Sequence, residues 1–262
     1  MYEGYKKTAG GIIIHTENDF EKMREAGKLA REVLDYIAPF VEVGASTEYL
    51  DKLCHDFILK NNAIPAPLGY RGYPKSVCTS INNVVCHGIP SKDDVLKNGD
   101  IINIDVTVIL NGYHGDTSRM FLVGNVSTMA SRLCKVTHDA MMLGIEKAKV
   151  GNTIREIGIA IQNYVEKNGY SCVKDFCGHG IGKIFHMEPQ IVHFNEAKSR
   201  YQDIVIEEGM FFTVEPMVNA GKSGTVISVK DGWTATTKDK SLSAQYEHTI
   251  GIKASGNEIF TL

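Results

Sequence analysis

Hydrophobic side chains recur at helical spacing in two stretches near the start of the chain. Between Asn18 and Phe40 they return every three to four residues, so we expect a helix there, capped by Asn18 or Asp19. Its predicted inward positions are Phe20, Met23, Ala26, Leu29, Ala30, Val33 and Ile37. A second helix is predicted from about Thr47 to Asn61, with Ser46 or Thr47 as its cap. Its predicted apolar face consists of Leu50, Leu53, Cys54, Phe57 and Ile58.

A run rich in β-branched residues, from Ile101 to Leu110, predicts an interior strand. It ends at Asn111-Gly112, the pair that best fits a two-residue type I′ turn, so a second strand should return from about Tyr113. The resulting register pairs Leu110 with Tyr113, Thr107 with Asp116 and Asp105 with Ser118. Asp105 and Asp116 then share one face of the hairpin, diagonal to each other at roughly 7–8 Å.

Two carboxylates on one face of an apolar sheet repel each other and lose solvation. Both stay ionised only if a positive charge lies between them, and one or two divalent cations would supply it. The alternative is a pair of solvated aspartates on an exposed face of the hairpin. Asp105 lies between Ile104 and Val106, which favours an interior strand.

The second half of the chain repeats the plan of the first. Residues 41–62 match residues 148–169 at a constant offset of 107, and residues 95–108 match 205–218 at an offset of 110. The second match places Asp105 over Glu215. Duplicated helix-helix-strand halves predict a pseudo-two-fold α+β fold around a central antiparallel sheet, in which the acids converge on one site. We see no Gly/Ser/Pro linker, so we expect a single catalytic domain over residues 1–262.

Composition narrows the class of protein. The formal net charge of -3 and the pI near 6.3 give no electrostatic footprint for nucleic acid or an anionic membrane. No apolar run reaches a signal-peptide core or the roughly 20 residues that span a bilayer, so we expect a soluble, cytoplasmic protein. Six cysteines without a CxxC pair are expected to be reduced structural thiols. Residues 63–90, rich in Gly, Pro, Tyr and Asn, predict loops around short strands.

Three further segments carry candidate ligands. His179 lies between two glycines, where the backbone can approach a ligand closely, although a buried structural histidine is the alternative. His186 follows seven residues later and is either a second ligand or a hydrogen-bond donor to substrate. Glu215 lies in an apolar strand, where an unpaired carboxylate is costly, so a metal or a cationic partner is expected. Glu247 precedes an apolar run and, considered alone, could be a surface acid.

Together these residues offer carboxylate and imidazole donors and no thiolate. Such a set suits hard or borderline divalent ions, namely Mn²⁺, Fe²⁺, Co²⁺ and Zn²⁺. Five ligands that include bridging acids suit two ions about 3.5–4 Å apart. The set is that of a two-metal hydrolase.

Four ordered segments carry a resemblance to a known family. INIDVTVILNGYHGDTSRMF, CGHGIGKIFHMEPQIVH, FFTVEPMVNAG and LSAQYEHTI closely resemble the signatures of type I methionine aminopeptidases, of the bacterial type in peptidase family M24. The likeness runs from about Glu17 to Leu262. It implies the pita-bread fold and a two-metal site with Asp105 bidentate to one ion, Asp116 and Glu247 bridging, and His179 and Glu215 completing the other.

The resemblance also implies substrate contacts. His87 and His186 would stabilise the tetrahedral intermediate and contact the scissile amide. The family's methionine pocket, an apolar slot suited to a thioether, falls on Tyr70, Tyr73, Cys78, Phe185 and Trp233. The alternative interpretation of these five residues is ordinary core and loop packing. Positions that hold a monovalent cation in some members fall on Asn82, Val84 and Ser243.

Three positions depart from the pattern of bacterial members. Pro67 and Arg71 lie where cysteine and histidine are frequent, and Met187 replaces the usual acid. All five proposed ligands are kept, so these changes bear on the pocket rim and on substrate preference. The stretch from Met187 to Val214 is too short for the helical insertion of type II enzymes.

The implied activity is removal of the initiator methionine from nascent proteins and peptides whose second residue is small. A hydroxide activated by two metal ions would attack the carbonyl, and Glu215 would move the proton. A monomeric state and a transient ribosome contact are expectations from the family alone. Two alternatives stay open, a proline-directed aminopeptidase of the same fold and a non-catalytic binding homologue.

Overall fold

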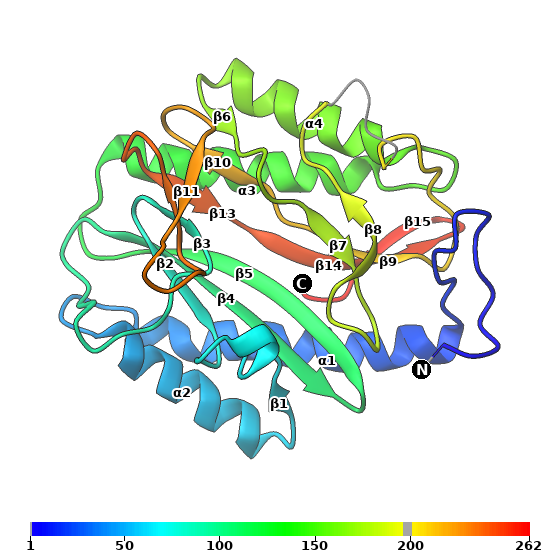
Figure 1. Cartoon of the computed structure of the whole chain (residues 1–262), viewed down its shortest axis with the longest axis horizontal. Coiled ribbons are helices and arrows are strands. Elements are labelled where there is room, and N and C mark those ends of the chain that lie inside the picture. Colours follow the sequence, from blue (N-terminus) through cyan, green and yellow to red (C-terminus); the bar gives the residue numbers. More distant parts are fainter. Residues whose placement is uncertain (1, 196–200) are drawn as a thin grey trace.

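A large antiparallel sheet runs through the middle of the protein, with helices packed along it (Figure 1). The structure, a computed structural model, describes residues 2–195 and 201–262. Its helices are α1 (Glu17–Ile37), α2 (Thr47–Lys60), α3 (Thr128–Lys147) and α4 (Ile154–Lys167), with 3₁₀ turns at Ala38–Phe40 and Tyr70–Gly72. Across these described residues, none of the helices is both long and apolar enough to cross a bilayer.

The large sheet has the strand order β1-β4-β5-β14-β9-β7-β8, with β2 beside β4 and β15 beside β14. Its strands are β1 (Ile64–Pro65), β2 (Cys78–Ile81), β4 (Ile101–Leu110), β5 (Tyr113–Leu122), β7 (Gly178–Gly180), β8 (Met187–Ile191), β9 (Phe211–Val214), β14 (Glu247–Lys253) and β15 (Gly256–Ile259). Two small sheets contain β13 (Ser243–Gln245), β10 (Met217–Asn219) and β6 (Ser171–Cys172), and β11 (Thr225–Ile227), β12 (Ala235–Thr237) and β3 (Val84–Cys86).

The predicted hairpin is confirmed in both bounds and register. Strands β4 and β5 are joined by Asn111 and Gly112, whose φ angles of 51° and 81° fit a turn that needs positive φ at both central residues. The Cα partners are Leu110 with Tyr113, Thr107 with Asp116, and Asp105 with Ser118. The two aspartates therefore project from the same face of the sheet.

Helix α1 matches the predicted stretch, but its cap was assigned wrongly. The helix begins at Glu17 with Thr16 as the N-cap, and Asp19 occupies the third helical position. The Asp19 carboxylate accepts hydrogen bonds from the backbone N–H of Thr16 at 2.7 Å and from its hydroxyl at 2.8 Å. The residue three positions after the cap thus satisfies the free donors of the preceding turn. All seven predicted inward positions are buried.

Helix α2 begins at Thr47 and ends one residue before the predicted limit. Ser46 is its cap and accepts a hydrogen bond from the backbone N–H of Tyr49 at 3.2 Å. Leu50, Cys54 and Ile58 are buried, whereas the remaining two predicted inward residues are half-buried and pack against the same core.

The internal repeat is confirmed by equivalent contacts in the two halves. Helix α4 is capped by Thr153, the repeat mate of Ser46. Isolated β-bridges join Ser46 to Val95 and Thr153 to Val205, which are equivalent pairs. The strands that meet at the centre of the sheet are β5 and β14, and the acid-bearing strands β4 and β9 flank this pair. The pseudo-two-fold axis therefore passes between β5 and β14.

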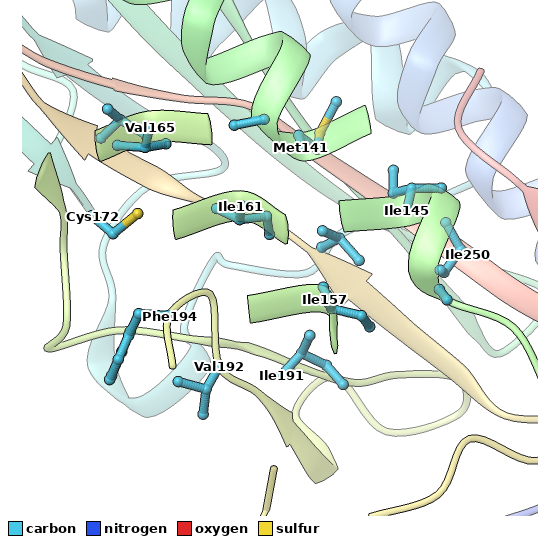
Figure 2. Close-up of a cluster of buried hydrophobic side chains, with 14 of the residues drawn as sticks. Met141, Ile145, Ile157, Ile161, Val165, Cys172, Ile191, Val192, Phe194 and Ile250 are labelled. Carbon is cyan, nitrogen blue, oxygen red and sulfur yellow. The ribbon is translucent and has the colours of Figure 1, made fainter. Parts of the chain in front are cut away.

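The helices cover one face of the sheet and leave the other face to the polar residues. Ile102, Ile104, Val106 and Val108 of β4 belong to the core that α1 and α2 close. A second core lies under α3 and α4, where Figure 2 shows side chains of both helices gathered in one cluster. Because strand side chains alternate, the odd-numbered residues of β4, including Asp105, face away from the helices.

The remaining fold predictions have these outcomes. Residues 63–90 form turns around the short strands β1, β2 and β3, as expected. All six cysteines are free. Within the stretch from Met187 to Val214, residues 196–200 lie outside the described residues.

Gly115 provides a test of how closely α1 packs on the hairpin. A Cβ atom at this position would overlap the backbone of Ala26 in α1. We expect Gly115→Ala to lower the free energy of unfolding by about 1–3 kcal/mol, because helix and strand must separate. Gly10→Ala is the control, since its Cβ would meet nothing closer than Thr8 Oγ1 at 3.7 Å. Equal urea midpoints for the two variants would contradict this packing.

Candidate active site

The five predicted ligands lie on five consecutive strands of the large sheet. In sheet order they are Asp105 on β4, Asp116 on β5, Glu247 on β14, Glu215 directly after β9, and His179 on β7. All five line one cavity of about 350 Å³. The alternative of solvated aspartates on an exposed face is therefore wrong.

Three of these residues already lie at ligand distances from one another. One donor atom from each of Asp116, His179 and Glu247 lies within 4.8 Å of the other two. His179 Nε2 is 3.5 Å from Asp116 Oδ2 and 3.6 Å from Glu215 Oε1. At these spacings several atoms can coordinate one ion with bonds of about 2.0–2.2 Å.

Hydrogen bonds fix which nitrogen of His179 faces the acids. Its Nδ1 is 3.1 Å from the carbonyl oxygen of Gly180, and its backbone N–H donates to Thr213 Oγ1 at 3.0 Å. A protonated Nδ1 leaves Nε2 as the nitrogen with a lone pair, on the side of Asp116 and Glu215. Histidines that bind metals are commonly oriented by such a carbonyl contact.

The two flanking glycines have a packing role that was not predicted. A Cβ on Gly178 would overlap the carbonyl oxygen of Thr213, and a Cβ on Gly180 would overlap that of Glu188. These glycines allow the neighbouring backbone to pack closely on β7, and the close approach of a ligand to this backbone stays a prediction.

The carboxylates are held by neighbours that the sequence analysis did not assign. Thr107 Oγ1 donates to Asp116 Oδ1 at 2.7 Å, and Thr213 Oγ1 donates to Glu215 Oε1 at 2.7 Å. Gln245 Nε2 donates to Glu215 Oε2 at 3.3 Å. Strand alternation could have found both threonines, since each lies two residues from a predicted ligand on the same strand face. Gln245 lies two residues before Glu247, so the same spacing was available as a signal for it.

Burial and mutual repulsion disfavour ionisation of the acids. Burial, with Asp116 and Glu215 nearby, raises the pKa of Asp105 well above its usual value. Burial, with Asp116 and Glu215 nearby, raises the pKa of Glu247 well above its usual value. Burial raises the pKa of Glu215 to about 7, although His179 and the Thr213 hydroxyl act to lower it. Burial alone would lower the pKa of His179, but Asp116 and Glu215 raise it. A cation between these groups would relieve the repulsion.

The donor set fits divalent metal ions. Among the described residues that line the cavity, Arg71 is the one permanently charged cation, and it lies exposed at the rim. Burial, with Asp105 nearby, raises the pKa of the Cys78 thiol well above its usual value, so this residue is not a thiolate ligand. What remains is carboxylate oxygen and imidazole nitrogen, the donors of hard and borderline ions.

Aromatic side chains form the wall beside the acids. The predicted pocket residues, Tyr70, Tyr73, Cys78, Phe185 and Trp233, all line the cavity. The Tyr73 hydroxyl donates to the carbonyl oxygens of Val77 and Gly88, at 3.1 and 2.9 Å, which leaves the ring to pack against Trp233 at a centroid distance of 5.2 Å. The slot is therefore apolar although two of its residues carry hydroxyl groups.

The two predicted substrate histidines lie on the same cavity. His87 has a positive φ of 57°, which is uncommon outside glycine and is typical of functional positions. Burial lowers its pKa. The ring of His186 lies 4.2 Å from that of His179, and its Nδ1 is 3.0 Å from the Tyr70 hydroxyl. Burial and the neighbouring His179 lower the pKa of His186 to about 3.

Of the three departures from the bacterial pattern, Pro67 and Arg71 line the cavity. Met187 begins β8 and is absent from the described lining. Four further lining residues were not predicted, namely Asp175, Phe176, Cys177 and Met217. Asp175 and Phe176 directly precede the His179 segment, Cys177 begins it, and Met217 lies two residues beyond Glu215. Proximity in sequence to a ligand was the available signal.

The residues predicted for a monovalent cation lie together but apart from the cavity. The backbone N–H of Ser243 donates to the carbonyl oxygen of Asn82 at 2.8 Å. Val84 begins β3, two residues after Asn82. None of the three belongs to the described lining of the cavity.

Comparison with known proteins supports the assignment of this site to a hydrolase. The model of metallopeptidase family M24 matches residues 21–254. The methionine aminopeptidase of Rickettsia prowazekii is 59% identical over 251 residues, covering 96% of this chain and 95% of the relative. That of Escherichia coli strain K12 is 56% identical over 252 residues, covering 96% and 94%. The crystal structure of the Rickettsia prowazekii enzyme superposes with a TM-score of 0.93, covering 96% of this chain and 100% of that chain.

The chain therefore belongs to metallopeptidase family M24 and, within it, to the methionine aminopeptidases. The pita-bread fold implied by the resemblance is confirmed by the match to the solved structure. Membership of a metallopeptidase family means that the protein uses divalent metal, which agrees with the donor set.

The acid cluster predicts the pH dependence of the metal-free protein. Glu215 has a folded-state pKa of about 7, above the 4.5 of a free side chain, so the folded state binds more protons in this interval. The contribution of Glu215 to stability should therefore fall as the pH rises from 4.5 to about 7 in the presence of EDTA. Glu215→Gln should make this fall shallower, whereas Glu21→Gln, an exposed change on α1, should not. Melting temperatures of wild type and both variants across the interval provide the test, and a difference between wild type and Glu215→Gln that does not change with pH would contradict it.

Proposed function

We propose that this protein removes the N-terminal methionine from nascent proteins and peptides whose second residue is small. The observation that carries the proposal is the meeting of five metal donors from five adjacent strands beside an aromatic slot in one cavity. The relatives named methionine aminopeptidase, at 56% and 59% identity, support the same reaction.

In this proposal two divalent ions are held by the five donors. Asp105, Asp116, His179, Glu215 and Glu247 would together hold these ions. Divalent ions bound there supply a lowered pKa for water and polarise a carbonyl oxygen. The free α-amine of the substrate is the remaining natural ligand, which would limit cleavage to chain ends.

Glu215 is the proposed proton carrier. A general base works best when its pKa lies near the operating pH, and burial raises the pKa of this group to about 7. Thr213 and Gln245 each donate to a different oxygen of the carboxylate. These two contacts hold the carboxylate in one orientation while it accepts a proton and returns it to the leaving amine.

His87 and His186 are the proposed contacts to the reacting amide. Because burial lowers the pKa of both, they are neutral near pH 7 and can donate a hydrogen bond without adding positive charge. His186 Nδ1 is engaged with Tyr70, so Nε2 is the nitrogen available to substrate. A hydrogen bond from these rings is then stronger to the tetrahedral intermediate than to the planar amide.

The aromatic slot is the proposed methionine pocket. Tyr73, Phe185 and Trp233 offer flat apolar surfaces, and Cys78 adds a small buried thiol to the slot. An unbranched thioether fits such a site and gains from contact between sulfur and aromatic rings. Pro67 and Arg71, at the same cavity, are the residues proposed to tune substrate preference.

Several finer proposals accompany this activity. Residues 1–262 act as a single catalytic domain, and Asn82, Val84 and Ser243 hold a monovalent cation. The protein works as a monomer in the cytoplasm, because nascent chains present their N-termini there, and it contacts the ribosome transiently. Sedimentation of the purified protein alone tests the monomeric state, and sedimentation with ribosomes tests the transient contact.

A peptide and metal panel tests the reaction. Apo protein should release methionine from Met-Ala-Ser but not from Met-Leu-Ser, and only after Mn²⁺, Fe²⁺, Co²⁺ or Zn²⁺ is restored. Preferential cleavage of a peptide with proline in second position, tested against alanine, would instead favour the proline-directed alternative. Tight metal binding without any cleavage would favour the non-catalytic one.

Glu215→Gln tests the proton carrier. The variant keeps the shape and the hydrogen-bonding neighbours of Glu215, so circular dichroism should be unchanged. We expect kcat to fall by a factor on the order of 10²–10⁴, the usual contribution of a positioned acid or base. Turnover within a few-fold of wild type would remove Glu215 from this role.

A further inference from the structure

The chain before α1 forms an arm, residues 2–15, that packs beside β9 and the loop between β7 and β8 (Figure 1). Lys7 and Ile13 form an antiparallel bridge within the arm. His15 closes it, because its backbone N–H donates to the carbonyl oxygen of Gly209 at 2.8 Å and its ring stacks on Phe211 at 3.9 Å. The arm is thus fixed to β9 at its end nearest α1.

Two tyrosines of the arm bind the loop between β7 and β8, residues 181–186, here called the His186 loop. The backbone N–H of Lys183 donates to the Tyr2 hydroxyl at 2.6 Å, and Lys183 Nζ donates to the Tyr5 hydroxyl at 2.7 Å. The ammonium group also lies over three aromatic rings, at 4.8 Å from Tyr5, 5.5 Å from Tyr113 and 5.8 Å from Tyr2. Such a cage attracts a cation on every side.

A buried carboxylate anchors this cage. Asp19, in the first turn of α1, accepts hydrogen bonds from the hydroxyl groups of Tyr5, at 2.8 Å, and Tyr113. The chain of contacts therefore runs from the ammonium of Lys183 through Tyr5 to the carboxylate of Asp19. The ammonium group and the carboxylate carry opposite charges and are linked through the Tyr5 hydroxyl, so each partly compensates the charge of the other.

The first part of the His186 loop contacts the arm on one side and β5 on the other. A Cβ on Gly182 would lie 2.5 Å from the Tyr2 hydroxyl and 2.8 Å from His15 Cε1, so the arm contacts this glycine directly. On the other side, the backbone N–H of His114 donates to the Gly182 carbonyl oxygen at 2.9 Å. The ring of His114 stacks on Phe185 with centroids 5.4 Å apart.

We infer that the N-terminal arm clamps the His186 loop, and that Tyr2, Tyr5 and Lys183 are positioning residues for His186. The end of the loop that faces the cavity carries Phe185 and His186, which contact Tyr70 and His179 through their rings. Ring contacts and one hydrogen bond to the Tyr70 hydroxyl hold this end of the loop, whereas the hydrogen bonds at Lys183 hold the loop from the side of the arm. The effect on turnover rests on the proposed function, but the clamp itself does not.

The test combines hydrogen exchange with kinetics on the full-length, metal-loaded protein. Tyr2→Phe removes the acceptor of the Lys183 amide, and Lys183→Met removes the ammonium group. In both variants we expect the rate of amide exchange in residues 181–187 to rise about tenfold. We expect kcat for Met-Ala-Ser to fall about tenfold with KM nearly unchanged, because His186 acts mainly in the transition state. Lys183→Arg keeps a cation in the cage and should recover most of kcat.

Matched controls separate the clamp from general loss of charge or of a hydroxyl group. Lys6→Met removes an exposed lysine from the same arm, and Tyr49→Phe removes an exposed hydroxyl from α2. Both should match wild type in loop exchange and in kcat. Tyr2→Phe changes one oxygen atom, so it reports on the clamp even if Lys183→Met folds poorly.

The outcomes separate the two claims. Wild-type exchange of the loop in both Tyr2→Phe and Lys183→Met would overturn the clamp, whatever the activity. Faster exchange with an unchanged kcat would overturn the positioning of His186. If wild-type protein released no methionine at all, the proposed function would fail, and the exchange data would still decide whether the arm holds the loop.

Discussion

Four carboxylates converge on one cavity, and their mutual repulsion is the constraint that the surrounding structure has to satisfy. Asp105, Asp116, Glu215 and Glu247 cannot all ionise beside each other without a cation. The sheet keeps them in place because each is carried by a strand that pairs with the next, from β4 through β5, β14 and β9. The helices on the opposite face supply the apolar burial that opposes this unfavourable charge density.

Neutral hydrogen-bond donors complete the arrangement without relieving the charge. Thr107, Thr213 and Gln245 orient the carboxylates, and Gly180 orients His179 through its carbonyl oxygen. None of these groups can neutralise an acid. Without a cation the clustered acids lower the stability of the folded protein. Functional sites commonly reduce stability in this way.

Local patterns in the sequence predicted the parts of this structure that local physics determines. The Asn111-Gly112 turn fixed the hairpin register, and the internal repeat predicted α4 and the strand position of Glu215. The cap of α1 was missed because Asn18 and Asp19 are themselves good capping residues, although Thr16 and Asp19 have the spacing of a capping box. The methionine pocket came from resemblance, since five scattered aromatic and thiol positions have no periodicity of their own.

Contacts between distant segments were beyond such reasoning. Nothing in the sequence near Tyr2 indicates that it meets Lys183, which is 181 residues away. The close backbone packing at Gly178 and Gly180 was equally invisible, because a glycine that admits a neighbouring strand looks the same as one that admits a ligand. Long-range pairing has to be read from the folded chain.

The pseudo-two-fold arrangement has a consequence for the order in which the protein is made. Asp105 and Asp116 come from the first half of the chain, whereas His179, Glu215 and Glu247 come from the second. During synthesis the first two acids leave the ribosome well before the strand that carries Glu247, and β14 must insert between β5 and β9 before the set is complete. The five-residue donor set is therefore complete only after β14 is in place, which is late in the synthesis of the chain.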